Sequence, residues 1–231
     1  MGAGCVCAAN LYVASTSHRF RDLPYLPIRW QDGLVGSLPL EAQSERIVIE
    51  DDCWLGINVV ICPGVTLGRG TVVGANSVVT NSTFPYSVVG GAPARLIGTR
   101  LAFQPPTSIH SSQQEDIPYF YAGFEVLPTE ESWRSASVRG RGVGQRFALA
   151  LRLEKGELLS LTLHSAAGAR LTHGLQEIAI PEGDSTSMIE PHPDMRGLLW
   201  FYVNGWSPGC IAIKSAYAIE LATSAEAPIP C

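Results

Sequence analysis

Aliphatic residues recur every six positions between Ile47 and Ser82, an interval that fits neither an α-helix nor an ordinary strand. Three positions after each one stands a glycine or a short polar residue, the types that tolerate the left-handed backbone of a sharp corner. The pattern therefore predicts short strands joined by corners and wound as a parallel β-helix, with three six-residue units in each coil. The aliphatic positions are Ile49, Leu55, Ile61, Leu67, Val73 and Val79, and the corner positions are Asp52, Asn58, Gly64, Gly70, Asn76 and Ser82.

The same two positions continue upstream and predict one further coil in residues 1–18. Between the coils, residues 19–46 form an irregular excursion, and a long interruption of a regular solenoid is usually functional. Since the chain opens already in register, either it is truncated relative to a longer parent or another element, such as a second domain, covers the coil edge. In the upstream coil the aliphatic positions are Met1, Cys7 and Val13, and the corners are Gly4, Asn10 and Thr16.

Beyond the coils the pattern changes. The run PYSVVGGAPARLIGTR predicts a closing glycine-rich loop and a short helix opened by Pro93. Residues 101–116 are rich in proline, serine and glutamine and read as a linker. In residues 117–231 apolar side chains alternate with a period of two, as in FALALRL and LSLTLHS. The expected fold class is therefore all-β, with a β-helix domain over residues 1–100 and a second, sandwich-like domain over 117–231.

Charge and cysteine usage narrow the function classes. Residues 1–100 carry seven arginines, no lysine and seven acids, whereas the rest of the chain carries nine basic and fourteen acidic residues and the whole net charge of −5. The sequence contains no cluster of basic residues of the kind that binds nucleic-acid phosphates, so a nucleic-acid-binding function is not expected. No signal peptide and no membrane span are visible, so we expect a cytoplasmic protein. The six cysteines show no CxxC pair and no zinc spacing, so no metal is expected.

His18 is the only histidine of the coil domain, and it stands where the excursion begins. A neutral imidazole at such a place is able to accept a proton from a substrate near pH 7. A surface corner residue explains a lone histidine equally well, so position alone leaves both interpretations open.

The run IEDDCWLGINVVICPGVTLGRGTVVGANSVVT, followed by FPYSVVGGAPARLIG, resembles the left-handed β-helix acyltransferases with hexapeptide repeats. These include maltose, nodulation-factor, antibiotic and surface-polysaccharide acetyltransferases, and HRFRD with PIRWQ beyond it is similar to the loop of the polysaccharide-modifying members. The resemblance covers residues 1 to about 100, and it alone supplies the left hand of the helix. It implies acetyl-CoA as co-substrate, laid along the coils, and a homotrimer with its active sites in grooves between neighbouring subunits.

The resemblance also implies roles for individual residues. His18 would be the general base, and Asp22 would hold its second nitrogen, although a solvated loop acid explains Asp22 as well. An oxyanion donor is expected among the backbone N–H groups near Gly56. Asn81 stands where relatives commonly carry a lysine, so one phosphate contact is either weaker or supplied by an arginine. The positions expected to bind acetyl-CoA are Trp54, Gly56, Ile57, Gly74, Ala75, Thr80, Asn81 and Arg95.

The leading hypothesis is an acetyl-CoA-dependent O-acetyltransferase acting on a sugar hydroxyl, in a surface polysaccharide or its precursor. Alternatives are an N-acetyltransferase on an amino sugar and a non-catalytic trimeric scaffold presenting the second domain. The carbonic anhydrase branch of this fold is set aside, because its zinc takes three histidines. The aromatic residues of the second domain have two interpretations: they form a surface on which sugar rings stack, or they belong to the core and interfaces. They are Tyr119, Phe120, Tyr121, Trp133, Trp200, Tyr202 and Trp206.

Overall fold

The computed structural model describes residues 1–35, 44–124, 127–129, 132–137, 145–204 and 211–220. The chain forms two compact units, Met1–Phe103 and Gln104–Cys231. The predicted change of architecture near residue 100 thus lies close to the boundary between them. Among the described residues no helix is long and apolar enough to cross a membrane.

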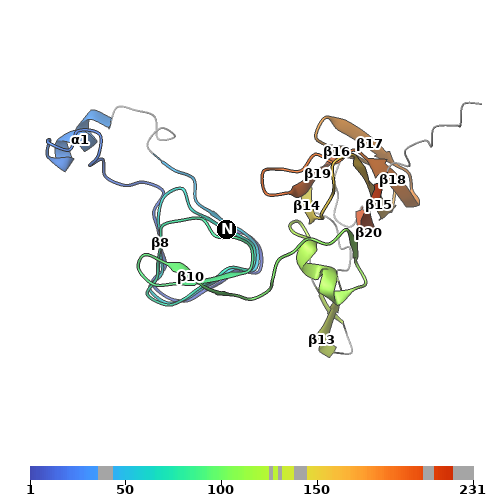
Figure 1. The fold of residues 1–231 in the computed structure, drawn as a ribbon, viewed down its shortest axis with the longest axis horizontal. Helices are drawn as coiled ribbons and strands as arrows, with labels where there is room; N and C mark the ends of the chain where they lie inside the picture. The colour runs from blue at the N-terminus through green and yellow to red at the C-terminus, as the bar shows by residue number, and fades with distance from the viewer. Residues whose placement is uncertain (36–43, 125–126, 130–131, 138–144, 205–210, 221–231) are drawn as a thin grey trace, which may run out of the picture. The chain divides into compact units, whose positions relative to one another are not determined.

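The first unit is a parallel β-helix whose strands are mostly two residues long (Figure 1). Strands one coil apart pair in parallel, as Trp54 pairs with Val72 and Val60 with Val78, so the predicted coil of three six-residue units is confirmed. The three sheets have the orders β1-β4-β7-β9-β10, β2-β5-β8 and β3-β6. Their strands are β1 (Val6–Cys7), β2 (Tyr12–Val13), β3 (Val48–Ile49), β4 (Trp54–Leu55), β5 (Val60–Ile61), β6 (Thr66–Leu67), β7 (Val72–Val73), β8 (Val78–Val79), β9 (Ser87–Gly90) and β10 (Arg95–Thr99).

The predicted aliphatic positions of the two main coils fill the interior of the helix. None is more than 7% exposed, because together they form one buried apolar cluster. The upstream coil also forms, since Val6 pairs with Trp54 and Val13 with Ile61. Its own aliphatic positions are more open, with Met1 79% and Val13 44% exposed, because the structure stacks a coil on only one side of them.

Most corners have the predicted left-handed backbone, but Thr16 and Ser82, the last predicted corner of each run of repeats, do not. Asn10, Asn58 and Asn76 adopt φ of 60°, 57° and 58°, the left-handed region that asparagine tolerates. Their side-chain amides form a ladder along one edge of the helix, because Asn10 Nδ2 donates to Asn58 Oδ1 and Asn58 Nδ2 to Asn76 Oδ1, each at 2.9 Å. The corner residues thus supply both the turn and a bond between successive coils.

One local prediction is wrong. The segment after Pro93 is not a helix but strand β10, which pairs antiparallel with β9, Arg95 lying opposite Gly90. The N–H of Ala94 donates to Val78 O at 2.8 Å. This bond to the coil holds the segment in an extended conformation rather than a helical one.

The second unit is a β-sandwich, as the alternating pattern predicts. Its two four-stranded antiparallel sheets have the orders β11-β20-β15-β18 and β14-β19-β16-β17. β11 lies within the predicted linker 101–116, so part of that segment is a sheet strand, held by its pairing with β20. The elements are β11 (Ser108–His110), the 3₁₀ helix η1 (Gln114–Tyr119), β12 (Leu127–Thr129), β13 (Ser132–Ser137), β14 (Arg146–Ala150), β15 (Glu157–Ser165), β16 (Ala169–His173), β17 (Gln176–Ile180), β18 (Gly183–Ile189), β19 (Leu198–Asn204) and β20 (Ile211–Glu220).

The aromatic residues of this unit divide between core and surface. Phe120 and Tyr121 are buried, and Tyr119 packs against the core. Trp200 and Tyr202 lie on β19 in alternation with the buried Phe201 and Val203, so they point outward. Trp206 and the side chain of Trp133 lie outside the described residues, as do Cys210 and Cys231.

Candidate functional site

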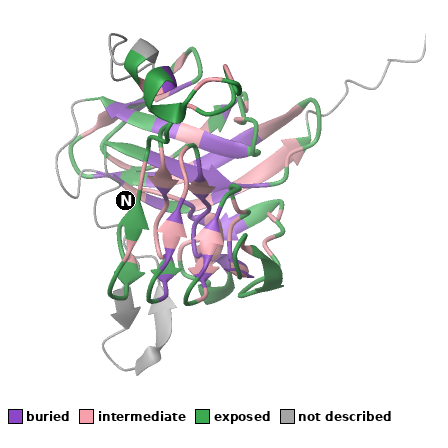
Figure 2. Ribbon diagram, turned by 90° about the vertical axis from the view of Figure 1, so that its left-hand side faces the viewer, coloured by how far each residue is buried: buried purple, intermediate pink, exposed green. Residues whose placement is uncertain are grey.

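The excursion leaves the coil near Ser15 and returns to it at Glu45, whose N–H donates to Ser15 O at 2.7 Å. In between lies the only helix described in this unit, α1 (Ile28–Val35). Gln31 on α1 is 3% exposed and ties the loop together, accepting from Leu23 N–H at 3.2 Å and donating to Leu26 O at 2.9 Å. Ile28, Arg29, Trp30 and Gly33 of α1 are exposed, and Asp32 is partly buried (Figure 2).

α1 positions a carboxylate against His18. Asp32 Oδ2 lies 2.7 Å from His18 Nδ1, and Asp32 Oδ1 accepts the N–H of Arg19 at 3.0 Å. This backbone bond, assisted by the bond to His18, lowers the pKa of Asp32 below its usual range despite partial desolvation. An ionised Asp32 favours the tautomer with the proton on Nδ1, which leaves Nε2 of His18 free to accept a proton.

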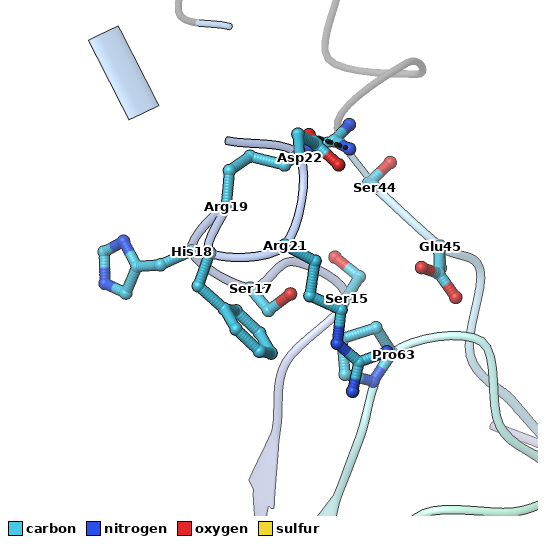
Figure 3. A pocket seen from close by; sticks show the side chains of 10 residues that line it. Ser15, Ser17, His18, Arg19, Arg21, Asp22, Ser44, Glu45 and Pro63 are labelled. Atoms are coloured by element: carbon cyan, nitrogen blue, oxygen red, sulfur yellow. Dashed lines mark hydrogen bonds and ion pairs between the residues drawn. The ribbon is translucent and has the colours of Figure 1, made fainter. Parts of the chain in front are cut away.

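Asp32, and not Asp22, is therefore the carboxylate that bonds His18 in the structure. The carboxylate of Asp22 pairs with Arg19 Nη1 at 3.2 Å, three residues away, and is exposed. In Figure 3 the ring of His18 points away from Asp22. The sequence shows no sign of this exchange, because fourteen residues separate His18 from Asp32 and only the fold of the excursion brings them together.

His18 borders two hollows on the coil surface. The larger, of about 640 Å³, combines an apolar coil wall with Ser17, Arg19 and Asp32. The smaller, of about 420 Å³, is polar and includes three serines (Figure 3). The coil wall of the larger hollow consists of Tyr12, Ala14, Val60, Ile61, Cys62 and Pro63, and the smaller is lined by Ser15, Ser17, Arg19, Phe20, Arg21, Asp22, Ser44, Glu45 and Pro63 beside His18.

Several predicted coenzyme positions lie on or beside the coil face of the larger hollow. Thr80 follows β8 as Cys62 follows β5, so it stands one coil further along the same face. Ile57 and Ala75 stack at the adjoining corner, where Asn76 N–H donates to Ile57 O at 2.8 Å. Ile57, Ala75 and Thr80 are exposed and accessible to a ligand.

Trp54 lies in β4, on the neighbouring face of the prism, where its side chain is 54% exposed. Arg95 begins β10 and is exposed, bonded only to its neighbour Ala94 O at 3.2 Å among the described residues. Asn81 is exposed and its amide lies 3.4 Å from Thr80 Oγ1. The structure therefore leaves these three side chains available on the surface.

Gly56 and Gly74, the two glycines predicted to lie along the coenzyme, differ in how much space a side chain would have. A Cβ at Gly56 would lie 2.7 Å from Ala75 N, so the stacking of coils itself requires glycine there. A Cβ at Gly74 would meet nothing closer than 3.5 Å, so packing does not require glycine at that position. The N–H of Gly56 donates to Val73 O at 2.9 Å and is therefore already used by the coil.

The described residues contain no group of three histidine, cysteine, aspartate or glutamate side chains placed to hold a metal ion. The buried Cys53 is instead part of the coil interior, where desolvation raises the pKa of its thiol to about 12.

These features define a class of protein, the parallel β-helices built from hexapeptide repeats. Residues 46–81 match the family described as bacterial transferase hexapeptide (six repeats), so the coils of the first unit are similar to the repeats of that family. The match spans the two main coils and ends before the second unit.

Individual relatives are acetyltransferases. A chloramphenicol acetyltransferase from Agrobacterium fabrum is 45% identical over 101 residues, which cover 40% of this chain and 46% of the relative. WbbJ of Escherichia coli, named for O-acetyl transfer in lipopolysaccharide biosynthesis, is 47% identical over 55 residues, 24% of this chain and 28% of the relative. Among solved structures, a hexapeptide-repeat acetyltransferase of Vibrio cholerae in complex with acetyl-CoA is 32% identical with a TM-score of 0.32, covering 42% of this chain and 46% of that one. The chain thus spans less than half the length of these relatives.

Proposed function

We propose that the first unit transfers an acetyl group from acetyl-CoA to a hydroxyl group of a sugar, within a surface polysaccharide or its precursor. One observation carries the proposal: an imidazole held through Nδ1 by Asp32 stands between an apolar and a polar hollow on a hexapeptide-repeat coil. The relatives that match this unit are named as acetyltransferases, which supports acetyl-CoA as the donor.

In the proposed reaction the acceptor oxygen attacks the thioester carbonyl carbon while Nε2 of His18 removes its proton. The C–S bond then breaks, and His18 returns the proton to the coenzyme thiolate, so that His18 ends the cycle neutral. Asp32 stabilises the imidazolium that forms in between. Such a base contributes roughly 10²–10⁴ to the rate, and holding both substrates beside it supplies much of the rest.

The larger hollow is the proposed place of the pantetheine arm, because its coil wall is apolar and leads toward Thr80. Ile57, Ala75 and Trp54 extend that surface, and Arg95 and Asn81 are proposed to meet the coenzyme phosphates. The serine-lined smaller hollow suits a polyhydroxylated acceptor.

A homotrimer is part of the proposal. The side chain of His18 is 82% exposed in a single chain, whereas general bases work best where water is excluded. A neighbouring subunit laid against this face would enclose it. Sedimentation of the full-length protein tests this, and a monomer with undiminished activity would contradict it.

The transfer itself is tested by following coenzyme A thiol release with a panel of acceptors: neutral and acidic oligosaccharides, an amino sugar and chloramphenicol. We expect release with saccharides and a loss of about 10²–10⁴-fold in kcat for His18→Ala. His164→Ala is the matched control, because His164 forms the same 2.7 Å imidazole–carboxylate pair in the second unit. Wild-type rates in His18→Ala would refute the proposal.

The products separate the remaining alternatives. An ester formed on a hydroxyl is cleaved by mild alkali, whereas the amide formed on an amino sugar survives it. A protein that binds no coenzyme A in calorimetry would instead be the trimeric scaffold that presents the second unit.

A further inference from the structure

The outer face of the sheet β14-β19-β16-β17 carries two aromatic rings beside an arginine. Trp200 and Tyr202 project from β19 on the side opposite the core. Arg146 lies directly across from Tyr202 on β14, and Thr172 lies across from it on β16. A row of ring, guanidinium and hydroxyl groups therefore crosses three strands of this face.

These groups are held in place before any ligand arrives. The guanidinium carbon of Arg146 lies 3.7 Å from the centroid of the Trp200 ring and 5.4 Å from that of Tyr202. Trp200 Nε1–H donates to Asp194 Oδ2 at 2.9 Å, which fixes the indole. The phenol ring of Tyr202 remains 45% exposed. A ligand that stacks on Tyr202 thus meets a cation already ordered by cation–π contact, and little side-chain entropy is lost on binding.

The charge of this face contrasts with the rest of the unit. Residues 101–231 carry nine basic and fourteen acidic residues. Yet Arg146 and, on the next row, Arg170 have no carboxylate partner among the described residues. On the outer face of the other sheet, the ammonium of Lys214 is paired with the carboxylate of Asp184, which is also bonded to His164. The same face also carries Glu177, across from Thr172 on β17, and Asp194, at the indole N–H of Trp200, so an anionic group is favoured only beside Arg146, at the β14 edge of the sheet.

We propose that the Trp200 face, defined by Arg146, Arg170, Thr172, Trp200, Tyr202 and Asn204, binds an acidic glycan. A sugar ring would stack on Tyr202, and its carboxylate would receive the guanidinium of Arg146, whose paired N–H groups match a carboxylate. Asn204 Nδ2 already donates to Thr172 Oγ1 at 3.0 Å, which leaves the amide oxygen to accept from sugar hydroxyls. This goes beyond acetyl transfer and does not depend on it.

The test is calorimetry of the full-length protein, without acetyl-CoA, against a galacturonic acid tetramer and the neutral maltotetraose. We expect the acidic tetramer to bind at least about tenfold more tightly, and its affinity to fall as salt rises. Arg146→Met and Tyr202→Ala should each weaken that binding about tenfold or more. Lys214→Met, a cation removed from the opposite face, should leave it unchanged. Thermal unfolding of each variant shows whether the sandwich is intact.

Four results would overturn the proposal. Equal affinity for both tetramers, or wild-type affinity in Arg146→Met, would remove the acidic glycan as the ligand. Equal losses in Lys214→Met would place binding elsewhere. A change of oligomeric state in Tyr202→Ala with unchanged glycan affinity would make the face an interface between copies. Because acetyl-CoA is absent, failure of the proposed acetyl transfer leaves each of these results interpretable.

Discussion

Two regions of the molecule contain nearly the same pair of side chains. In the excursion His18 Nδ1 lies 2.7 Å from Asp32 Oδ2, and on the sandwich His164 Nδ1 lies 2.7 Å from Asp184 Oδ1. Both imidazoles are solvent-accessible, 82% and 49% exposed. Distance and residue type alone would therefore nominate both as general bases.

Their surroundings differ. The second oxygen of Asp32 receives a backbone N–H from Arg19, and the pair borders hollows on a coil face. The second oxygen of Asp184 is bonded by the ammonium of Lys214, on the outer face of a sheet. The difference teaches that an imidazole–carboxylate pair becomes a candidate site through what stands next to it: room for two substrates, and a carboxylate whose position is fixed by the backbone.

The largest expected effect separates the two carboxylates. Asp32→Asn should lower kcat of acetyl transfer by about 10²-fold, because an amide lets the imidazole take the wrong tautomer and no longer stabilises its charge. The KM for acetyl-CoA should change little. Steady-state kinetics of the purified variant provide the measurement.

The control is Asp184→Asn, which should keep the wild-type kcat. Comparable losses in both variants would point to general damage rather than to positioning of His18. A normal kcat in Asp32→Asn would leave His18 without the partner that the geometry assigns to it.

The next prediction compares a glycine that the packing of the coils requires with one that is expected to contact the coenzyme. Gly56→Ala should lower the free energy of unfolding by about 1–3 kcal/mol, because its methyl group would press on the backbone of Ala75 in the next coil. Gly74→Ala has room for its methyl group and should unfold within about 0.5 kcal/mol of the wild type. If the coenzyme lies along this surface, Gly74→Ala should still raise the KM for acetyl-CoA by about fivefold.

Chemical denaturation and kinetics on the same two preparations check both halves of this prediction. A stable Gly74→Ala variant with an unchanged KM would move the coenzyme away from Gly74. A Gly56→Ala variant as stable as the wild type would contradict the close stacking of coils seen at Ala75.

The coils were predictable because a six-residue period reports directly on a repeated local geometry. Every aliphatic position of the main coils was correctly placed in the interior, and the corner asparagines in the left-handed region. The sandwich followed from its period of two. The strand after Pro93 was not predicted, because its conformation depends on pairing with β9, and the local glycine and proline pattern does not reveal that tertiary contact.

The candidate site was predictable only in part. His18 stood out because it is alone and opens the excursion. Its partner did not, since Asp22 is close in sequence whereas Asp32 is brought in by α1 and by the bonds of the buried Gln31. Irregular segments carry no period, so their contacts have to be seen in three dimensions.

The smallest expected effect is a difference in salt sensitivity between the pKa values of Asp32 and Asp184. The pKa values of Asp32 and Asp184 are both lowered, but the leading cause is the N–H of Arg19 for the first and the bonded Lys214 ammonium for the second. Salt screens an exposed ion pair far more than a backbone hydrogen bond. Carboxyl titrations by NMR at low and high salt should therefore show the pKa of Asp184 rising toward its ordinary value while that of Asp32 stays low. A lowered carboxyl pKa stabilises the folded protein at pH values above the pKa of the same group in the unfolded chain, near 4. Any stability that either carboxyl contributes should therefore be lost as the pH falls through its pKa in the folded protein. Equal salt sensitivity of the two carboxyls would mean that the backbone bond from Arg19 does not set Asp32 apart.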